Sequence, residues 1–303
     1  MPRHRVAVIA ASLLLLSASA CSSQSPPKGK AGSETPSGAP TGGETASEVL
    51  SARDFDPGNF TDSTNIDNEW LPLQPGTRWV WEGHAFDGEE RIRRLVVITV
   101  SDLTKVIDGV RAVVVWDLDY NNDNLEEAEI ALFAQDDDGN IWHLGQYPEE
   151  YAGAEIVKTP AWIAGLEGAR PGIAMKAEPQ LGAPSYAQGW GPDVGWNDRA
   201  ETYRMGEQTC VPVDCYEDVL VTREFSRTEP HAFQLKYYAR GVGNIRVGWG
   251  GANEEERETM VLVDFVHLGP GALAKVRQKV LEEEERAYEL SKVYAGTPRA
   301  EPV

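Results

Sequence analysis

The chain has 303 residues, with 48 Asp and Glu against 28 Lys and Arg, so its formal net charge is -20. A surface this acidic repels phosphate backbones and anionic lipid headgroups, which excludes nucleic-acid binding and electrostatic attachment to a membrane. The length suits one large domain, because all-β domains often exceed about 200 residues as a single unit.

Residues 1–20 have the layout of a secretory signal peptide. Arg3 and Arg5 precede an apolar run, Val6–Leu16, which is too short to span a bilayer. Small residues then lead to Cys21, an ending that resembles the lipobox of bacterial lipoproteins, although Ala18 stands where that motif prefers Leu. The resemblance implies cleavage before Cys21, a diacylglyceryl group on its sulfur and further acylation, for instance with palmitate. The alternative is ordinary signal cleavage with an incidental Cys21.

This leader predicts an exported protein, anchored by lipid on the extracytoplasmic face of the bacterial cell envelope. Residues 21–53 are rich in Ser, Gly and Pro and predict a disordered tether, because they contain little to bury. We expect an antiparallel β domain over residues 54–268 and a C-terminal helix and tail over residues 269–303.

Two further cysteines, Cys210 and Cys215, predict a disulfide, since exported chains occupy compartments where disulfides persist. The intervening Val-Pro-Val-Asp segment suits a hairpin turn that brings the two cysteines together. The alternative is a redox or metal-binding pair, which the absence of further Cys ligands disfavours.

Alternating apolar residues predict a series of strands. Trp79 and Trp81 alternate with polar neighbours in the first strand, and a long covering loop with short strands is expected over residues 148–200. The other expected strands are Glu90–Ser101, Thr104–Ile107, Val110–Tyr120, Thr202–Met205, Val219–Phe225, Phe233–Ala239, Gly243–Val247 and Glu258–His267.

Residues 113–146 read as a three-stranded meander with one apolar face and one acidic face. The apolar face is predicted to contain Val114, Trp116, Leu118, Tyr120, Ala128, Ile130, Leu132, Ala134, Trp142 and Leu144. Asp117, Asp119, Glu127 and Glu129 fall on the other face. We predict a mainly β fold, an antiparallel meander forming a curved sheet or open barrel, with the apolar face inside and the carboxylates outside.

After Gly269, apolar residues recur every three or four positions, which predicts an amphipathic helix that packs across the sheet. Glu282–Glu285 interrupts this apolar stripe, so the alternative is a protruding or dimerising helix.

Several segments between residues 60 and 248 resemble the recurring phrases of an uncharacterised family of exported bacterial proteins. They are IDNEWLPLQPGTRWVWEG, FAQDDDGNIWHLGQ, ARPGIAMKAEPQLG, YEDVLVTREFS and KYYARGVGNI. Related sequences often read Asn-Pro-Tyr-Phe-Pro-Leu where this one has Asn68 to Leu73 with an aromatic Trp70. The resemblance implies a shared architecture and export, and no activity, cofactor or catalytic residue.

One acidic stretch has the alternating oxygen spacing of a calcium loop: Asp117, Asp119, Asn121 and Asp123. It lacks the glycine and the flanking helices of an EF-hand, so a calcium site is only the alternative to solvated turns. We otherwise expect no cofactor.

The histidines His84, His143, His231 and His267 are scattered, without the spacing of a zinc motif. His143 is expected as a surface or cross-strand residue rather than a base, and no nucleophile elbow or phosphate-binding loop is present. The sequence therefore predicts a protein that is not an enzyme.

The predicted function is noncatalytic binding of a small hydrophobic ligand within the curved sheet. Trp79, Trp81, Trp116 and Trp142 are the candidate lining residues. The alternative is a structural or protein-interaction module with a solid core, and a hydrolase is the third class. Ligand identity, partners and oligomeric state are not encoded in any recognisable motif.

Overall fold

The computed structural model describes residues 55–303, so the predicted signal peptide, the lipidation site Cys21 and the tether lie outside the described residues. The long strands are β1 (Thr77–Asp87), β2 (Glu90–Ile107), β3 (Val110–Asn121), β4 (Asn124–Gln135), β5 (Ile141–Ala152), β11 (Arg199–Cys210), β12 (Cys215–Phe225), β13 (Phe233–Ala239), β14 (Gly243–Gly250) and β15 (Thr259–His267). The short strands are β6 (Glu155–Lys158), β7 (Trp162–Ile163), β8 (Arg170–Met175), β9 (Tyr186–Ala187), β10 (Gly189–Trp190) and β16 (Glu301–Pro302). The helices are the 3-10 turn η2 (Pro57–Asn59), α2 (Pro270–Leu290) and α3 (Lys292–Ala295).

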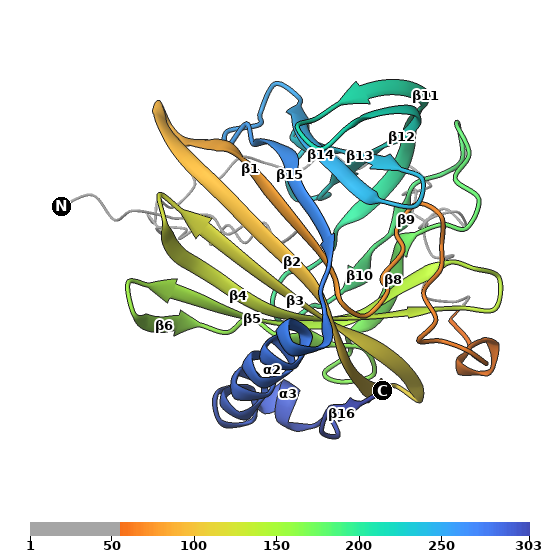
Figure 1. Cartoon of the computed structure of the whole chain (residues 1–303), viewed down its shortest axis with the longest axis vertical. Helices are drawn as coiled ribbons and strands as arrows, with labels where there is room; N and C mark the ends of the chain where they lie inside the picture. Colours follow the sequence, from red (N-terminus) through yellow and green to blue (C-terminus); the bar gives the residue numbers. More distant parts are fainter. Residues whose placement is uncertain (1–54) are drawn as a thin grey trace, which may run out of the picture.

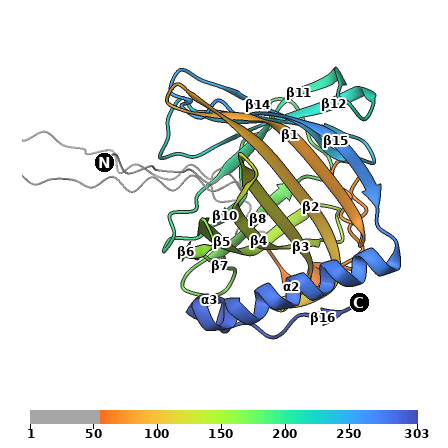
Figure 2. The same ribbon diagram turned by 60° about the vertical axis from the view of Figure 1, so that its left-hand side comes forward.

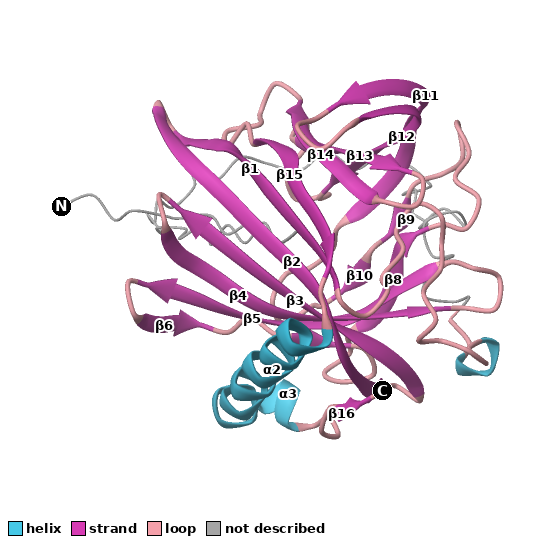
Figure 3. Ribbon diagram, in the orientation of Figure 1, coloured by secondary structure: helices cyan, strands magenta, loops and turns pink. Residues whose placement is uncertain are grey.

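The strands form one antiparallel sheet in the order β10-β8-β5-β4-β3-β2-β1-β15-β14-β13-β12-β11-β9. This sheet curves into a nearly closed barrel (Figure 1), and Figure 3 shows how completely strands dominate the domain. The prediction of a mainly antiparallel curved sheet or open barrel with a C-terminal helix is confirmed.

A short segment joins the two edges of the sheet. The strand β9 pairs with β11 at one edge and β10 pairs with β8 at the other, with only Gln188 between them. The backbones approach closely here, because a Cβ on Gly172 of β8 would lie 2.2 Å from the nitrogen of Gly189. Glycine permits this contact, so the segment around Gln188 forms the seam of the barrel.

Several strands are longer than the sequence predicted. Glu90–Ser101 and Thr104–Ile107 are not separate strands but one 18-residue strand, β2, with a register shift between Val100 and Thr104. The irregular pairing lets the strand bend without ending, which is how a bulge supports a curved sheet.

The helix α2 lies across the outside of the barrel, as Figure 2 shows, and the predicted packing against the sheet is observed. Together with α3 it covers an outer core of apolar residues from β2 to β5. Central members of this outer core are Leu103, Val114, Ile130, Leu132, Leu144 and Val280. No helix among residues 55–303 is both long and apolar enough to cross a membrane.

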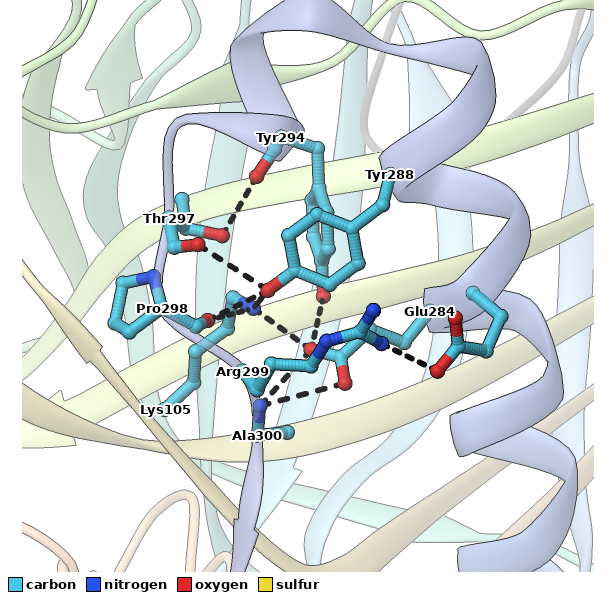
Figure 4. Close-up of polar contacts among 9 residues, drawn as sticks. Lys105, Glu284, Tyr288, Tyr294, Thr297, Pro298, Arg299 and Ala300 are labelled. Carbon is cyan, nitrogen blue, oxygen red and sulfur yellow. Dashed lines mark hydrogen bonds and ion pairs between the residues drawn. The ribbon is translucent and has the colours of Figure 1, made fainter.

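The acidic interruption of the helix is part of this contact. Glu283 and Glu284 are buried against the sheet, where Trp116 Nε1 donates to Glu283 at 2.8 Å and Lys105 Nζ lies 2.7 Å from Glu284. Figure 4 shows Lys105 enclosed by Glu284, Tyr288 and the C-terminal tail. Because both acids find partners on the sheet, they do not turn the helix away from it.

The predicted assignment of inside and outside is wrong for the meander. The apolar set on β3 and β4 belongs to the outer core beneath α2, while Asp117 and Glu129 face the interior of the barrel. A second core, the inner core, fills part of that interior and includes Trp70, Trp79, Trp81, Val115, Ile245 and Leu262. Both faces of these strands are therefore buried, one under the helix and one inside the barrel.

Candidate functional site

The barrel interior contains a cavity of ≈ 220 Å³, which we call the chamber. Its apolar wall includes Leu73, Trp79, Trp81, Val96, Val115 and Met260. Its polar wall includes Asp117, Glu129, His143, Glu224, Lys236 and Glu258. The chamber is thus amphipathic, with aromatic surface at one side and ionisable groups at another.

The two tryptophans of the apolar wall are held in place by the backbone of the opposite strands. Trp79 Nε1 donates to the carbonyl of Val242 at 2.6 Å, and Trp81 Nε1 donates to the carbonyl of Asn244 at 3.1 Å. Their rings are nearly parallel, with an interplanar angle of 12° and centroids 6.4 Å apart. Because their polar atoms are satisfied, these rings present a fixed apolar surface to the chamber.

Some of the interior charges form ion pairs. Lys236 Nζ on β13 lies 2.7 Å from Glu224 Oε2 on β12. Arg94 on β2 bridges Asp119, at 2.8 Å, and Glu258, at 3.1 Å. Burial works against the Lys236 ammonium, but the Glu224 carboxylate beside it raises the pKa of Lys236 above its usual value.

Two other carboxyl groups have no cation in contact with them. Asp117 on β3 and Glu129 on β4 are direct cross-strand partners, and Asp117 Oδ1 and Glu129 Oε2 are buried without any hydrogen-bond partner among the described residues. Burial raises the pKa of both groups well above the usual range, and repulsion from Asp119 adds to the rise at Asp117, as repulsion from Asp117 does at Glu129. Asp119 and Glu127 form the next cross-strand pair of the same face.

His143 also faces the chamber rather than the solvent, so a surface position is wrong, whereas the cross-strand position is observed opposite Phe133. It is 7 % exposed, its ring stacks on Phe133, and its Nε2 has no hydrogen-bond partner among the described residues. Burial lowers the pKa of His143 to about 3, so the ring stays neutral at physiological pH.

The structure divides the four predicted lining tryptophans into two groups. Trp79 and Trp81 line the chamber, whereas Trp116 and Trp142 lie on the outer face and do not. Trp116 bonds to Glu283 of the helix, and Trp142 Nε1 donates to Asp136 at 2.8 Å beneath Phe55 and Phe60. The expectation fails because the apolar face of β3 to β5 is the outer one, where the helix covers Trp116 and the segment of Phe55 and Phe60 covers Trp142.

The geometry does not support the predicted calcium site. Asp119 and Asn121 both contact Arg94, and Asp123 pairs with Arg93. Among residues 55–303, no group of three or more His, Cys, Asp and Glu side chains is arranged to hold a metal ion. The side-chain oxygens of this stretch therefore contact arginines or, at Asp117, face the chamber.

The predicted disulfide is confirmed. Cys210 and Cys215 are bonded, with an S–S distance of 2.03 Å, and they join the ends of β11 and β12. Both residues are exposed at the end of this hairpin. Neither cysteine is among the residues that line the chamber.

Between β5 and β11 the chain forms loops with the short strands β6 to β10, as the sequence predicted. Trp162 and Trp196 stack with centroids 5.8 Å apart and make a small cluster with Ala169. Trp196 also lines the chamber, whereas Trp190 is exposed. This segment therefore seals part of the barrel near the seam.

The interior acids were missed although their sequence pattern was visible. Asp117 and Glu129 lie on one predicted face of neighbouring strands, and the tight turn at residues 121–124 fixes their register. A cross-strand carboxyl pair could have been predicted from that turn. Its position inside the barrel could not, because this depends on the helix that covers the other face.

No protein-family model matches the chain, and no curated protein matches it in sequence. Two solved structures are similar in outline. One is an inferred exported protein with a YmcC-like fold from Bacteroides fragilis, at 10% identity and a TM-score of 0.38, covering 66% of this chain and 99% of that one. The other is an inferred lipoprotein from Parabacteroides distasonis, at 11% identity and a TM-score of 0.36, covering 66% of this chain and 100% of that one. A likeness at this level carries no argument about function.

Proposed function

We propose that this chain is an exported, lipid-anchored protein of the bacterial cell envelope that binds one small molecule inside its barrel without converting it. The chamber of ≈ 220 Å³ is the observation that carries the proposal. Pockets for drug-sized ligands measure about 300–1,000 Å³, so the ligand is smaller than these. The leader and Cys21 support export and anchoring.

Two properties distinguish the chamber from a packing defect. Protein interiors are close-packed, and voids larger than a water molecule are few. Buried polar atoms are nearly always hydrogen-bonded, yet Asp117, Glu129, His143 and Trp196 each contribute an unpartnered polar atom among the residues that line this space. A bound molecule would fill the space and satisfy such atoms, whereas the alternative of a solid-cored module requires a filled interior.

The first experiment asks what the protein carries. Native mass spectrometry of the protein extracted from its own envelope should show a species heavier than the lipidated polypeptide by one small molecule. The added mass should disappear on denaturation. Protein of polypeptide mass only, at every extraction condition, would contradict retention of a ligand.

A second experiment locates the binding site with a defined probe. Isothermal titration calorimetry with 2-phenylethanol should give one site per chain, and the cavity-filling change Ala131→Phe should abolish it. The matched control is Ala154→Phe, at an exposed turn, which should bind as the wild type does. Equal binding by both variants would place the probe elsewhere.

Lipid anchoring has a separate test. Cells labelled with palmitate should incorporate the label into this protein, and the change Cys21→Ala should remove the label while export continues. Label retained in the variant would reject Cys21 as the acylated residue.

One observation favours a second candidate, an acid–base catalyst. Asp117 and Glu129 form a carboxyl pair with raised pKa values that faces the chamber, and such pairs can share proton-transfer work. If a co-purified molecule is converted by the protein, Glu129→Gln should retain binding and lose the conversion. Binding without any conversion supports the preferred, noncatalytic function.

A further inference from the structure

The chamber contains more carboxyl groups than cations. Glu224 is matched by Lys236, and Glu258 is matched by Arg94, which also holds Asp119. After these pairings, Asp117 and Glu129 remain in the polar wall without a cation in contact. Burial favours the protonated form of this pair, and a positive group placed in the space would favour its ionised form.

The unpartnered oxygens are both buried, on one buried side chain and one that is partly exposed. Glu129 is 4 % exposed and its Oε2 accepts no hydrogen bond among the described residues. Asp117 on the neighbouring strand is half-buried, and its Oδ1 is buried and also accepts none among these residues. A buried acceptor without a donor is unfavourable, and native proteins rarely retain one. Two such oxygens on directly opposed residues call for a ligand that donates several hydrogen bonds from one atom.

A third side chain of the chamber wall, opposite Phe133 and four residues along β4 from Glu129, also lacks a donor. Backbone groups of Gly145 and Gln188 hydrogen-bond to the ring of His143, and its Nε2, buried beside the chamber, has no partner. A neutral imidazole that has used its N–H on the backbone presents the other nitrogen as an acceptor. His143 therefore adds a third acceptor to the polar wall and no positive charge.

The aromatic wall lies at a defined distance from this acid pair. Cross-strand pairing places Trp79, Ile98, Asp117 and Glu129 in one row, on β1, β2, β3 and β4. Adjacent strands are about 4.8 Å apart, so the backbones at Trp79 and Asp117 are separated by roughly 10 Å. A ligand whose charged group and apolar body are a few bonds apart would span this row, with Ile98 between its two ends.

We propose that the chamber binds a small organic cation, with its ammonium group at Asp117 and Glu129 and its apolar body along Ile98 toward Trp79. An ammonium supplies up to three donors from one atom, which matches the unpartnered acceptors. Indole rings attract cations and cover apolar groups equally well, which suits the other end. This inference rests on the proposed binding function and names the class of its ligand.

The test compares three probes of similar shape and different charge. Calorimetric titrations of the whole chain with 2-phenylethylamine, 2-phenylethanol and phenylacetate should rank the affinities in that order. The amine should bind at least about 10-fold more tightly than the alcohol, because charge-assisted hydrogen bonds are roughly twice as strong as neutral ones. Equal binding of amine and alcohol, or tightest binding of phenylacetate, would overturn the cation inference and leave the binding function standing. No binding of any probe would count against the binding function itself.

Matched variants assign the selectivity to the acid pair. Asp117→Asn and Glu129→Gln should each reduce the preference for the amine over the alcohol to less than about 3-fold while alcohol binding persists. The control Asp138→Asn, at an exposed turn, should keep the full preference. Circular dichroism should show that both variants fold, and the three-probe ranking on the wild type decides the question if either does not.

A calcium titration tests whether the acid pair binds a metal ion instead of an organic cation. Titration with calcium chloride alone should give no binding heat, and calcium should not displace the amine. Saturable calcium binding that competes with 2-phenylethylamine would assign the acid pair to a metal ion and overturn the inference.

Discussion

The two faces of the ribbon formed by β3 and β4 differ in what covers them. On the outer face, Val114, Ile130 and Leu132 pack beneath α2 in an apolar layer. On the inner face of the same strands, Asp117 and Glu129 line a chamber with oxygens that lack partners. Alternation along a strand therefore separates two buried environments here, and it does not separate inside from outside.

The two faces also treat buried charge differently. Beneath the helix, Lys105 contacts Glu284, and Arg286 contacts Glu149 at 2.7 Å. Inside the barrel, the acids outnumber the cations that contact them. Charge that is locally neutralised fits a structural role, and an acid pair with raised pKa values beside a cavity fits a role in recognition.

The largest expected effect is on the outer face. Lys105→Met leaves the fully buried Glu284 without its cation and should lower the free energy of unfolding by ~3–5 kcal/mol. Urea unfolding measures the loss. The control Lys279→Met removes an exposed partner of Glu282 and should cost at most ~0.5 kcal/mol. If Lys105→Met cost no more than this control, the outer layer would not depend on the buried pair.

A matched pair of truncations separates a packed layer from a hollow one. Leu132→Ala opens a new void in the outer core and should lower the free energy of unfolding by ~2–5 kcal/mol. Leu73→Ala enlarges an existing space, so its loss should be smaller by about 1 kcal/mol or more. Denaturant unfolding of both variants gives the comparison. Equal losses would mean that the barrel interior is packed as tightly as the outer core.

Glu283 is the acid of the outer layer with an unpartnered oxygen, and it gives the layer a pH dependence. Burial raises the pKa of Glu283 to about 8. The folded chain therefore keeps a proton that the unfolded chain releases near pH 4, and stability falls as pH rises from about 4 to 8. Glu283→Gln, which keeps an acceptor for Trp116, should be nearly neutral at pH 4 and stabilising by on the order of 3 kcal/mol at pH 8.

Unfolding curves at both pH values measure this difference. The exposed Glu289→Gln serves as the control and should show no such gain at pH 8. A stabilisation by Glu283→Gln that is the same at pH 4 and pH 8 would show that the proton is not the cause.

The smallest effect on stability is expected at the disulfide, which lies at the end of a hairpin rather than on either face of β3 and β4. The Cys210–Cys215 disulfide closes a five-residue separation at the exposed end of a hairpin. Replacing both cysteines with serine should cost about 2 kcal/mol or less, because short loops gain little from cross-linking. Binding of 2-phenylethanol should be unchanged, and its loss would connect this hairpin to the chamber.

Much of the fold could be predicted from local sequence, because strand alternation and the helical period are local properties. Phe233–Ala239 was predicted with the observed bounds of β13, and a helix was predicted after Gly269, where α2 begins at Pro270. The turn at residues 121–124 also fixes which acids oppose each other. These features depend on neighbours that are close in the chain.

The orientation of the sheet could not be predicted, because it depends on partners far apart in the chain. Lys105 and Glu284 come together only when α2 packs on β2, and the sequence near either residue contains no signal that predicts this contact. Trp79 and Trp116 occupy similar alternating patterns, yet one lines the chamber and the other bonds to the helix. When a helix covers the outer face of a sheet, an apolar stripe can lie on that outer face rather than inside the barrel.

A crystal structure of the protein soaked with 2-phenylethylamine tests most directly whether the barrel interior is a recognition chamber. We expect one probe molecule inside the barrel, with its nitrogen within hydrogen-bond distance of Asp117 or Glu129 and its ring toward Trp79. An interior filled by protein side chains, or probe bound only on the outer surface, would contradict this.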